Sequence, residues 1–78
     1  MDDAPELSDT EATVLRAVHA EGGADLYALA RAVGTGPRTV QEAVRGLAQK
    51  DLVIVPDRGS TVYCTPAGED VARTSRRG

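Results

Sequence analysis

The side chains best suited to chemistry lie on one face of a predicted helix within Gly36–Asp51, GPRTVQEAVRGLAQKD. The polar side chains of this face are Arg38, Thr39, Gln41, Glu42 and Arg45. Val40, Val44 and Leu47 recur at spacings of four and three, which places them on one apolar stripe. A helix of this length is a rod of roughly 20 Å, which fits the major groove of B-DNA. Arg and Gln side chains can read base edges there, and this is the first hypothesis for the chain.

The sequence offers few candidate catalytic residues, because it contains only one cysteine and one histidine. A single cysteine excludes an internal disulfide and a multi-cysteine zinc site. His19 and Cys64 could in principle form a nucleophile–base pair, but nothing in the sequence positions them together. We expect Cys64 to be buried as a small hydrophobe and His19 to lie near a helix C-terminus, where imidazole suits the dipole. We therefore expect no enzyme, no metal site and no cofactor.

The net charge of −3 is unevenly distributed. The first 25 residues carry seven acids and one base, whereas residues 26–78 carry five acids and eight bases. This split permits a basic face opposite an acidic one.

The length of 78 residues suits one small domain. The absence of Phe and Trp predicts an aliphatic core. Met1 is followed by two aspartates, unlike a signal peptide, and no apolar run approaches the roughly 18 residues of a membrane span. We expect a cytoplasmic protein without a membrane partner.

Two helices are predicted before the Arg-rich one. Ser8 to Glu11 reads as a capping box for a helix that runs to about Ala20 and ends at Gly22-Gly23. Asp25 can cap a shorter helix through Val33, with a minimal strand at Ala24 before it. Gly34-Thr35-Gly36 then forms a tight turn, so the second and third helices make a helix-turn-helix arrangement.

From Leu52 the apolar period changes to that of strands. A β-branched run over 52–56, a turn over 57–60 and a return strand over 61–65 predict a hairpin. We expect Val53 opposite Cys64 and Val55 opposite Val62, with all four on the buried face. That arrangement leaves Ile54 and Tyr63 exposed on the other face.

A last helix is predicted to start at Thr65-Pro66, with Val71 and Ala72 as its apolar anchors. We expect a disordered acidic arm over residues 1–7, a domain over 8–73 and a basic tail over 74–78. The fold class is therefore α+β: three helices with a helix-turn-helix, a two-stranded wing and a C-terminal helix.

This order of elements resembles the winged-helix family, and most closely its MarR-like small transcriptional regulators. The residues that carry the resemblance are Leu29-Ala30, Thr39-Val40, Val44 and Leu47, Lys50 to Val53, and Thr65 to Gly68. At the junction after the third helix, Asp51 stands where the family usually has Gly; Asp tolerates the left-handed conformation of that position better than most residues.

The resemblance implies sequence-specific binding of double-stranded DNA and a role in transcription regulation. The helix 37–50 would lie in the major groove, with Arg38 and Arg45 on guanine, Gln41 on adenine, and Glu42 either on cytosine or paired with a neighbouring Arg. Its N-terminus, with Pro37 and Thr39, would lie by a phosphate. Arg58 in the wing would reach the backbone or the adjacent minor groove, and Arg31 and Lys50 are the implied secondary phosphate contacts.

The alternative is a winged helix that acts as a protein-interaction adaptor and binds no DNA, an interpretation that the overall acidity favours. Its interface would include Ile54 and Tyr63. These two residues, or the last helix, are also the candidate surface of a homodimer, since regulators of this type usually bind as two-fold pairs.

Overall fold

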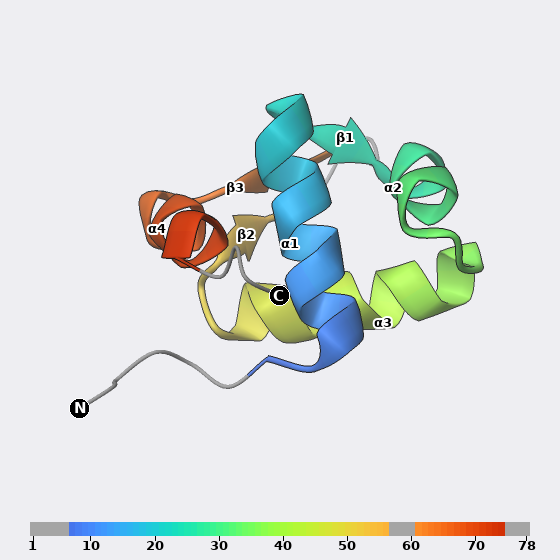
Figure 1. Ribbon diagram of the computed structural model, residues 1–78, viewed down its shortest axis with the longest axis horizontal. Helices are drawn as coiled ribbons and strands as arrows, with labels where there is room; N and C mark the ends of the chain where they lie inside the picture. The colour runs from blue at the N-terminus through green and yellow to red at the C-terminus, as the bar shows by residue number, and fades with distance from the viewer. Residues whose placement is uncertain (1–6, 57–60, 75–78) are drawn as a thin grey trace.

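The computed structural model describes residues 7–56 and 61–74. In Figure 1, α1 crosses α3, and α2 and α4 lie on either side of it. The elements are α1 (Asp9–Glu21), β1 (Ala24–Asp25), α2 (Leu26–Val33), α3 (Pro37–Gln49), β2 (Val53–Ile54), β3 (Thr61–Cys64) and α4 (Pro66–Thr74). Four helices with a small antiparallel sheet confirm the predicted winged-helix architecture.

The start and end of α1 follow the signals read from the sequence. The Ser8 hydroxyl accepts a hydrogen bond from the Glu11 N–H at 3.1 Å, and the Glu11 carboxylate accepts one from the Ser8 N–H at 3.0 Å. This reciprocal pair satisfies two backbone donors that the first turn would otherwise leave without partners. Gly22 ends the helix in the left-handed conformation with φ of 70°, which costs glycine little because it has no side chain.

The helix-turn-helix forms as predicted. The Asp25 carboxylate caps α2 by accepting from the Ala28 N–H at 2.7 Å, and Gly34 ends α2 with φ of 81°. Pro37 then occupies the first turn of α3, where its fixed φ suits a helix and its missing N–H is not needed.

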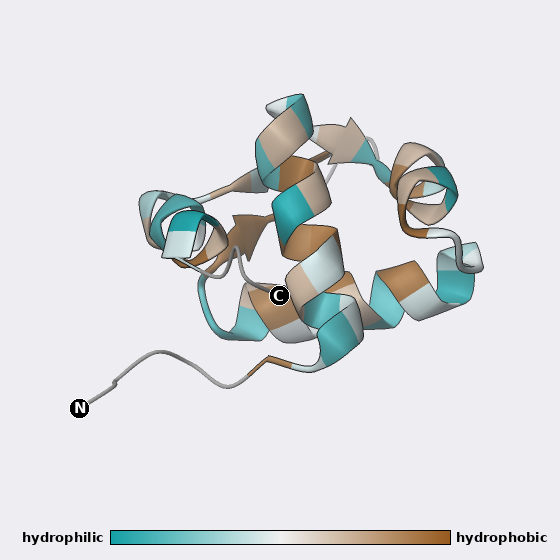
Figure 2. Ribbon diagram, in the orientation of Figure 1, coloured by the Kyte–Doolittle hydropathy of each residue, from teal (hydrophilic) through white to brown (hydrophobic). Residues whose placement is uncertain are grey.

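The core is aliphatic and lies between the three N-terminal helices, the sheet and α4. Figure 2 shows brown, apolar stretches on both α1 and α3. Among the described residues, fourteen buried apolar side chains form the core: Val14, Leu15, Val18, Ala24, Leu29, Ala30, Val40, Ala43, Val44, Leu47, Leu52, Val53, Val62 and Ala72. The predicted stripe of Val40, Val44 and Leu47 is thus confirmed as the buried face of α3, and the opposite face is left for a partner.

The sheet has the strand order β1-β3-β2 and confirms part of the predicted register. Val53 pairs with Cys64 as expected, and Ile54 pairs with Tyr63. The prediction for Val55 was wrong: β2 ends at Ile54, so Val55 does not pair with Val62, and Val55 is 44% exposed. Val62 pairs with Ala24 of β1, along the other edge of β3. Strand alternation fixes the direction of a side chain only while pairing continues, and here pairing stops one residue earlier.

Hydrogen bonds join the junction between α3 and β2 to the start of α4. Asp51 takes a left-handed φ of 62°, as expected for this position. The Thr65 hydroxyl donates to the Asp51 carbonyl at 2.7 Å and accepts from the Gly68 N–H at 3.0 Å, and the Thr65 N–H donates to the Leu52 carbonyl at 3.1 Å. A β-carbon at Gly68 would collide with the Leu52 carbonyl, so α4 packs directly on this backbone.

The expected arm and tail lie almost entirely outside the described residues, apart from Leu7 and Thr74. None of the helices within 7–56 and 61–74 is long and apolar enough to cross a membrane.

Candidate nucleic-acid interface

The outer face of α3 carries its polar side chains into solvent. The exposed residues on this face include Pro37, Arg38, Thr39, Gln41, Glu42 and Arg45. No described residue forms an ion pair with Arg38 or Arg45, so the alternative in which Glu42 pairs with one of them is not seen among the described residues. The two guanidinium groups are therefore available to an external acceptor.

The N-terminal end of α3 also offers backbone donors. Its N-cap residue is Gly36, which has no side chain to accept from the first turn. The free N–H groups of a helix N-terminus, together with the helix dipole, favour a nearby anion. This end of α3 therefore suits a phosphate.

Two clefts flank α3, so the outer face of this helix stands out between them as a ridge. One cleft of about 270 Å³ is lined by Leu26, Gln41, Val44, Arg45, Ala48 and Val55. The other, of about 240 Å³, is lined by Ser8, Thr10, Glu11, Thr39, Glu42 and Ala43. A helix that stands between two clefts can enter a groove of a duplex while its neighbours stay outside.

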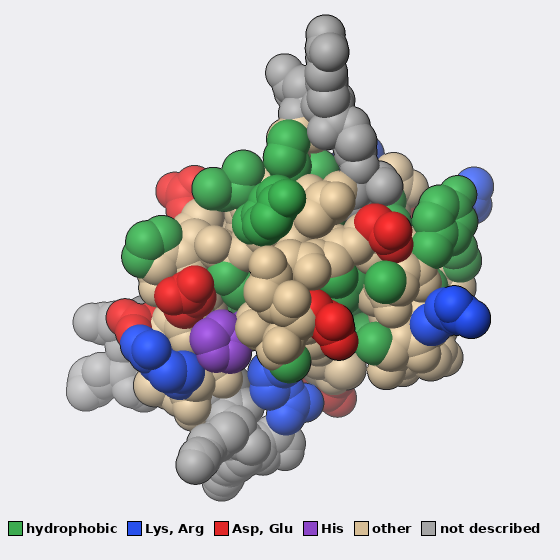
Figure 3. Space-filling model, turned by 90° about the horizontal axis from the view of Figure 1, so that it is seen from above, with side chains coloured by type: hydrophobic (Ala, Val, Ile, Leu, Met, Phe, Trp, Pro, Cys, Tyr) green, Lys and Arg blue, Asp and Glu red, His purple; other side chains and the backbone are tan. Residues whose placement is uncertain are grey.

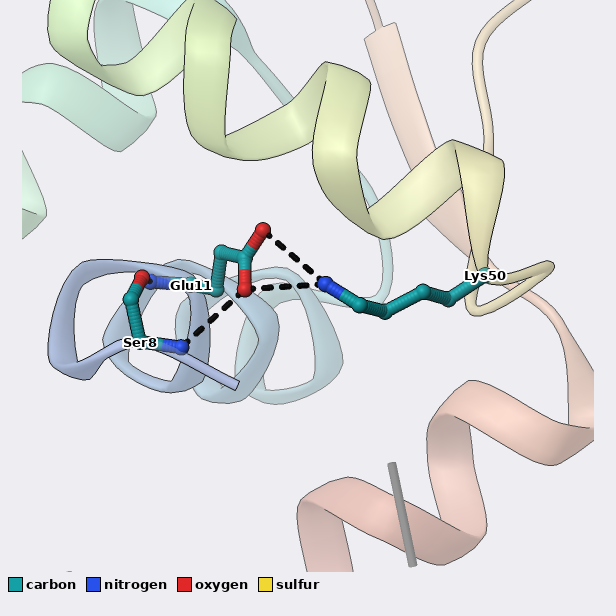
Figure 4. A network of polar contacts seen from close by, with 3 residues as sticks. All are labelled: Ser8, Glu11 and Lys50. Carbon is teal, nitrogen blue, oxygen red and sulfur yellow. Dashed lines mark hydrogen bonds and ion pairs between the residues drawn. The ribbon is translucent and has the colours of Figure 1, made fainter. Parts of the chain in front are cut away.

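The sequence also predicts DNA contacts outside the α3 ridge, by Arg31, Arg58 and Lys50. Arg31 is exposed on α2, the helix that braces α3. Arg58 lies outside the described residues. Lys50 is partly exposed and forms an ion pair, since its Nζ lies 3.1 Å and 3.2 Å from the two carboxylate oxygens of Glu11 (Figure 4).

The Glu11–Lys50 pair was not expected from the sequence. It joins residues 39 positions apart, and neither periodicity nor motif spacing links them. The one signal was Gly46, because a glycine inside a helix often marks a close approach. A β-carbon at Gly46 would collide with the Glu11 carboxylate, which confirms that α1 and α3 meet there.

His19 and Cys64 form no hydrogen bond with each other in the described part of the chain. His19 is exposed in the last turn of α1, and Cys64 is half-buried in β3 rather than fully buried. Burial, with a smaller contribution from the negative charge of Glu69, raises the pKa of the Cys64 thiol above its ordinary value. A thiol with a raised pKa is a poor nucleophile at neutral pH.

The outer face of the sheet exposes Ile54 and Tyr63, at 53% and 45%, as predicted. A further exposed aromatic side chain, not predicted from the sequence, is that of Tyr27, which is 69% exposed at the start of α2. In the face shown in Figure 3, several apolar side chains lie together in the upper part, and others are separated by charged side chains and backbone. The apolar exposure is thus dispersed over several elements.

Comparison with known proteins identifies the family of this domain. Residues 3–66 match the family described as sugar-specific transcriptional regulator TrmB. The chain belongs to this family. No curated protein matches it.

Solved structures of bacterial regulators share the fold. A MarR-family transcriptional regulator from Silicibacter pomeroyi is 31% identical, with a TM-score of 0.75 over 87% of this chain and 49% of that one. A point mutant of ZitR from Lactococcus lactis is 17% identical, with a TM-score of 0.87 over 99% of this chain and 56% of that one. BpsR of Bordetella bronchiseptica, whose DNA binding is regulated by 6-hydroxynicotinic acid, is 22% identical, with a TM-score of 0.85 over 96% and 56%. The TrmB-family chain thus spans about half the length of the solved structures that it matches.

Proposed function

We propose that this TrmB-family domain binds double-stranded DNA in a sequence-specific manner and regulates transcription in the cytoplasm. The observation that carries the proposal is the ridge of α3, where Arg38, Gln41 and Arg45 are exposed and none of them is engaged by another described side chain. An exposed helix face with forked donors between two clefts is the arrangement that reads base edges in a major groove.

The contacts follow from the chemistry of each side chain. Arg38 and Arg45 each present a fork of donors that matches the O6 and N7 atoms of guanine, and Gln41 matches the N6 and N7 atoms of adenine. Glu42 accepts from cytosine N4, while Thr39 and the backbone at Pro37 lie by a phosphate. Arg31 on α2 contacts a phosphate, and Arg58 contacts the backbone or the adjacent minor groove.

The test is duplex binding by a variant with Arg38→Ala and Arg45→Ala. We expect wild type to bind duplexes selected from a random library. Since a good bidentate pair contributes roughly 1–3 kcal/mol, the double variant should lose at least about 30-fold in affinity. Arg73→Ala is the matched control, because Arg73 is exposed on α4 and pairs with Asp70. Circular dichroism checks the fold. Wild type without affinity at about 50 mM salt, where non-specific binding is strong, would refute the proposal.

We also propose that two copies associate through the outer face of the sheet, at Ile54 and Tyr63. These two side chains are paired across β2 and β3 and remain half-exposed, which favours contact with a second protein surface. Two copies would place two α3 ridges on successive turns of one duplex face. The protein-interaction alternative would use the same residues with a different partner.

Fluorescence can report on this association because the sequence has two tyrosines and no tryptophan. In Tyr27→Phe, Tyr63 is the only strong emitter. Its emission should change with protein concentration, and Ile54→Asp should abolish the change. Sedimentation of wild type at tens of micromolar should give a dimer, and a clean 8.2 kDa species would contradict the proposal.

A further inference from the structure

Glu11 lies where the N-terminus of α1 meets α3, the main helix of the proposed interface. Its Oε1 accepts from the Ser8 N–H at 3.0 Å and from Lys50 Nζ at 3.1 Å, and its Oε2 lies 3.2 Å from the same Nζ (Figure 4). The Glu11 side chain is only 15% exposed, whereas that of Lys50 is 34% exposed. One carboxylate therefore serves the N-terminus of α1 and the C-terminal end of α3 together.

The contact is possible because α3 has a glycine beneath the carboxylate. A β-carbon at position 46 would collide with Glu11 Oε2, so any other residue would displace the Glu11 carboxylate from its present position. Lys50 is the C-cap residue of α3, and its own N–H donates to the Leu47 carbonyl at 3.1 Å. The pair thus acts on the helix end itself, and the base-reading side chains lie on the same rigid rod.

Lys50 would otherwise be a natural phosphate contact, since a lysine at the end of a recognition helix carries a mobile point charge. Here its ammonium donates to both carboxylate oxygens, which compensate its positive charge at the protein surface. The cleft beside the pair includes Glu42 as well as Glu11, so the surroundings on that side are acidic. These contacts favour an internal role for Lys50 over contact with DNA.

We infer that Glu11 is a positioning residue of the DNA interface: it fixes the C-terminal end of α3 against α1 and withholds Lys50 from the phosphate backbone. The inference rests on the proposed function for its DNA-dependent part. It assigns Lys50 a different role from the phosphate contact that the sequence predicted.

The first test needs no DNA. Lys50 is the only lysine in the sequence, so an amine-reactive ester followed by mass spectrometry reports on it alone, apart from the α-amino group. In Glu11→Gln we expect Lys50 to react roughly twofold to fivefold faster than in wild type, in line with the strength of partly exposed ion pairs. Asp9→Asn is the matched control, because it removes one acid from the first turn of the same helix. Equal rates in Glu11→Gln and Asp9→Asn would overturn the inference.

The second test measures the salt dependence of binding to a fixed fluorescent duplex of mixed sequence. Each phosphate contact contributes about 0.9 to the slope of log affinity against log salt. We expect Lys50→Met and Asp9→Asn to keep the wild-type slope. Glu11→Gln should steepen it by about 0.9, and adding Lys50→Met should restore it. A shallower slope in Lys50→Met alone would show that Lys50 contacts phosphate and would overturn the inference.

The third test separates positioning from charge. Lys50→Met loses the anchor but releases no cation, so it should lower the affinity ratio of a selected duplex to a scrambled one. A drop of roughly fivefold or more is the cost of one impaired base contact. An unchanged ratio would overturn the positioning role. If wild type binds no duplex, the proposed function fails, and the amine-reactivity assay still decides whether Glu11 holds Lys50.

Discussion

Replacing Thr65 with valine should destabilise the domain through two hydrogen bonds. The hydroxyl of Thr65 donates to the Asp51 carbonyl at 2.7 Å and accepts from the Gly68 N–H at 3.0 Å. Valine keeps the shape and removes both bonds. Loss of the N-cap bond costs about 1 kcal/mol, and the bond to the carbonyl adds about another 1 kcal/mol. We therefore expect the free energy of unfolding to fall by about 2 kcal/mol.

Urea denaturation followed by circular dichroism measures this change. For a domain of this size, about 2 kcal/mol lowers Tm by roughly 8–16 °C. Thr65→Ser keeps the hydroxyl and should retain most of the stability. Thr74→Val is the matched control, because the Thr74 hydroxyl only donates to carbonyls of its own exposed helix turn. If Thr65→Val were as stable as Thr65→Ser, the hydroxyl would not fasten α4 to the α3–β2 junction.

Two further changes test the cap of α1 and the thiol of β3. Ser8→Ala should cost about 1 kcal/mol of stability and speed amide exchange at Glu11, whereas Ser8→Asp should preserve both; unchanged exchange would contradict the cap. The raised pKa of Cys64 means that the unfolded chain loses the thiol proton more readily, so stability should be complete at lower pH and decline as pH rises above about 8.5. Cys64→Ala should show a smaller decline over the same range, and an identical pH profile would refute the assignment.

The sequence was most informative where a local signal determines the backbone. The capping box at Ser8, the left-handed glycines at 22 and 34, and Pro37 at the start of α3 each act within a few residues. These signals were enough to predict the helix-turn-helix and the buried stripe of α3. They succeed because caps, turns and helical periodicity depend on short-range chemistry.

The sequence was less informative where contacts join distant segments. Val55 was placed in the core by strand alternation, but β2 ends before it, at Ile54, and Val55 pairs with no residue of β3. The Glu11–Lys50 pair was missed because any of several acids could have met the lysine. The sequence predicted which side chains lie on the exposed face of α3, whereas their contacts with DNA remain predictions.

The three-stranded sheet also influences the order in which parts of the domain fold. Its β1–β3 pairing joins Ala24 to Val62, so it can form only after a long loop closes. The contacts of α2 with α3 are much more local, and local contacts form early in folding. We expect the helical part to be structured in the folding transition state while β1–β3 pairing is not. Substitutions in β3 should therefore accelerate unfolding and leave the folding rate nearly unchanged.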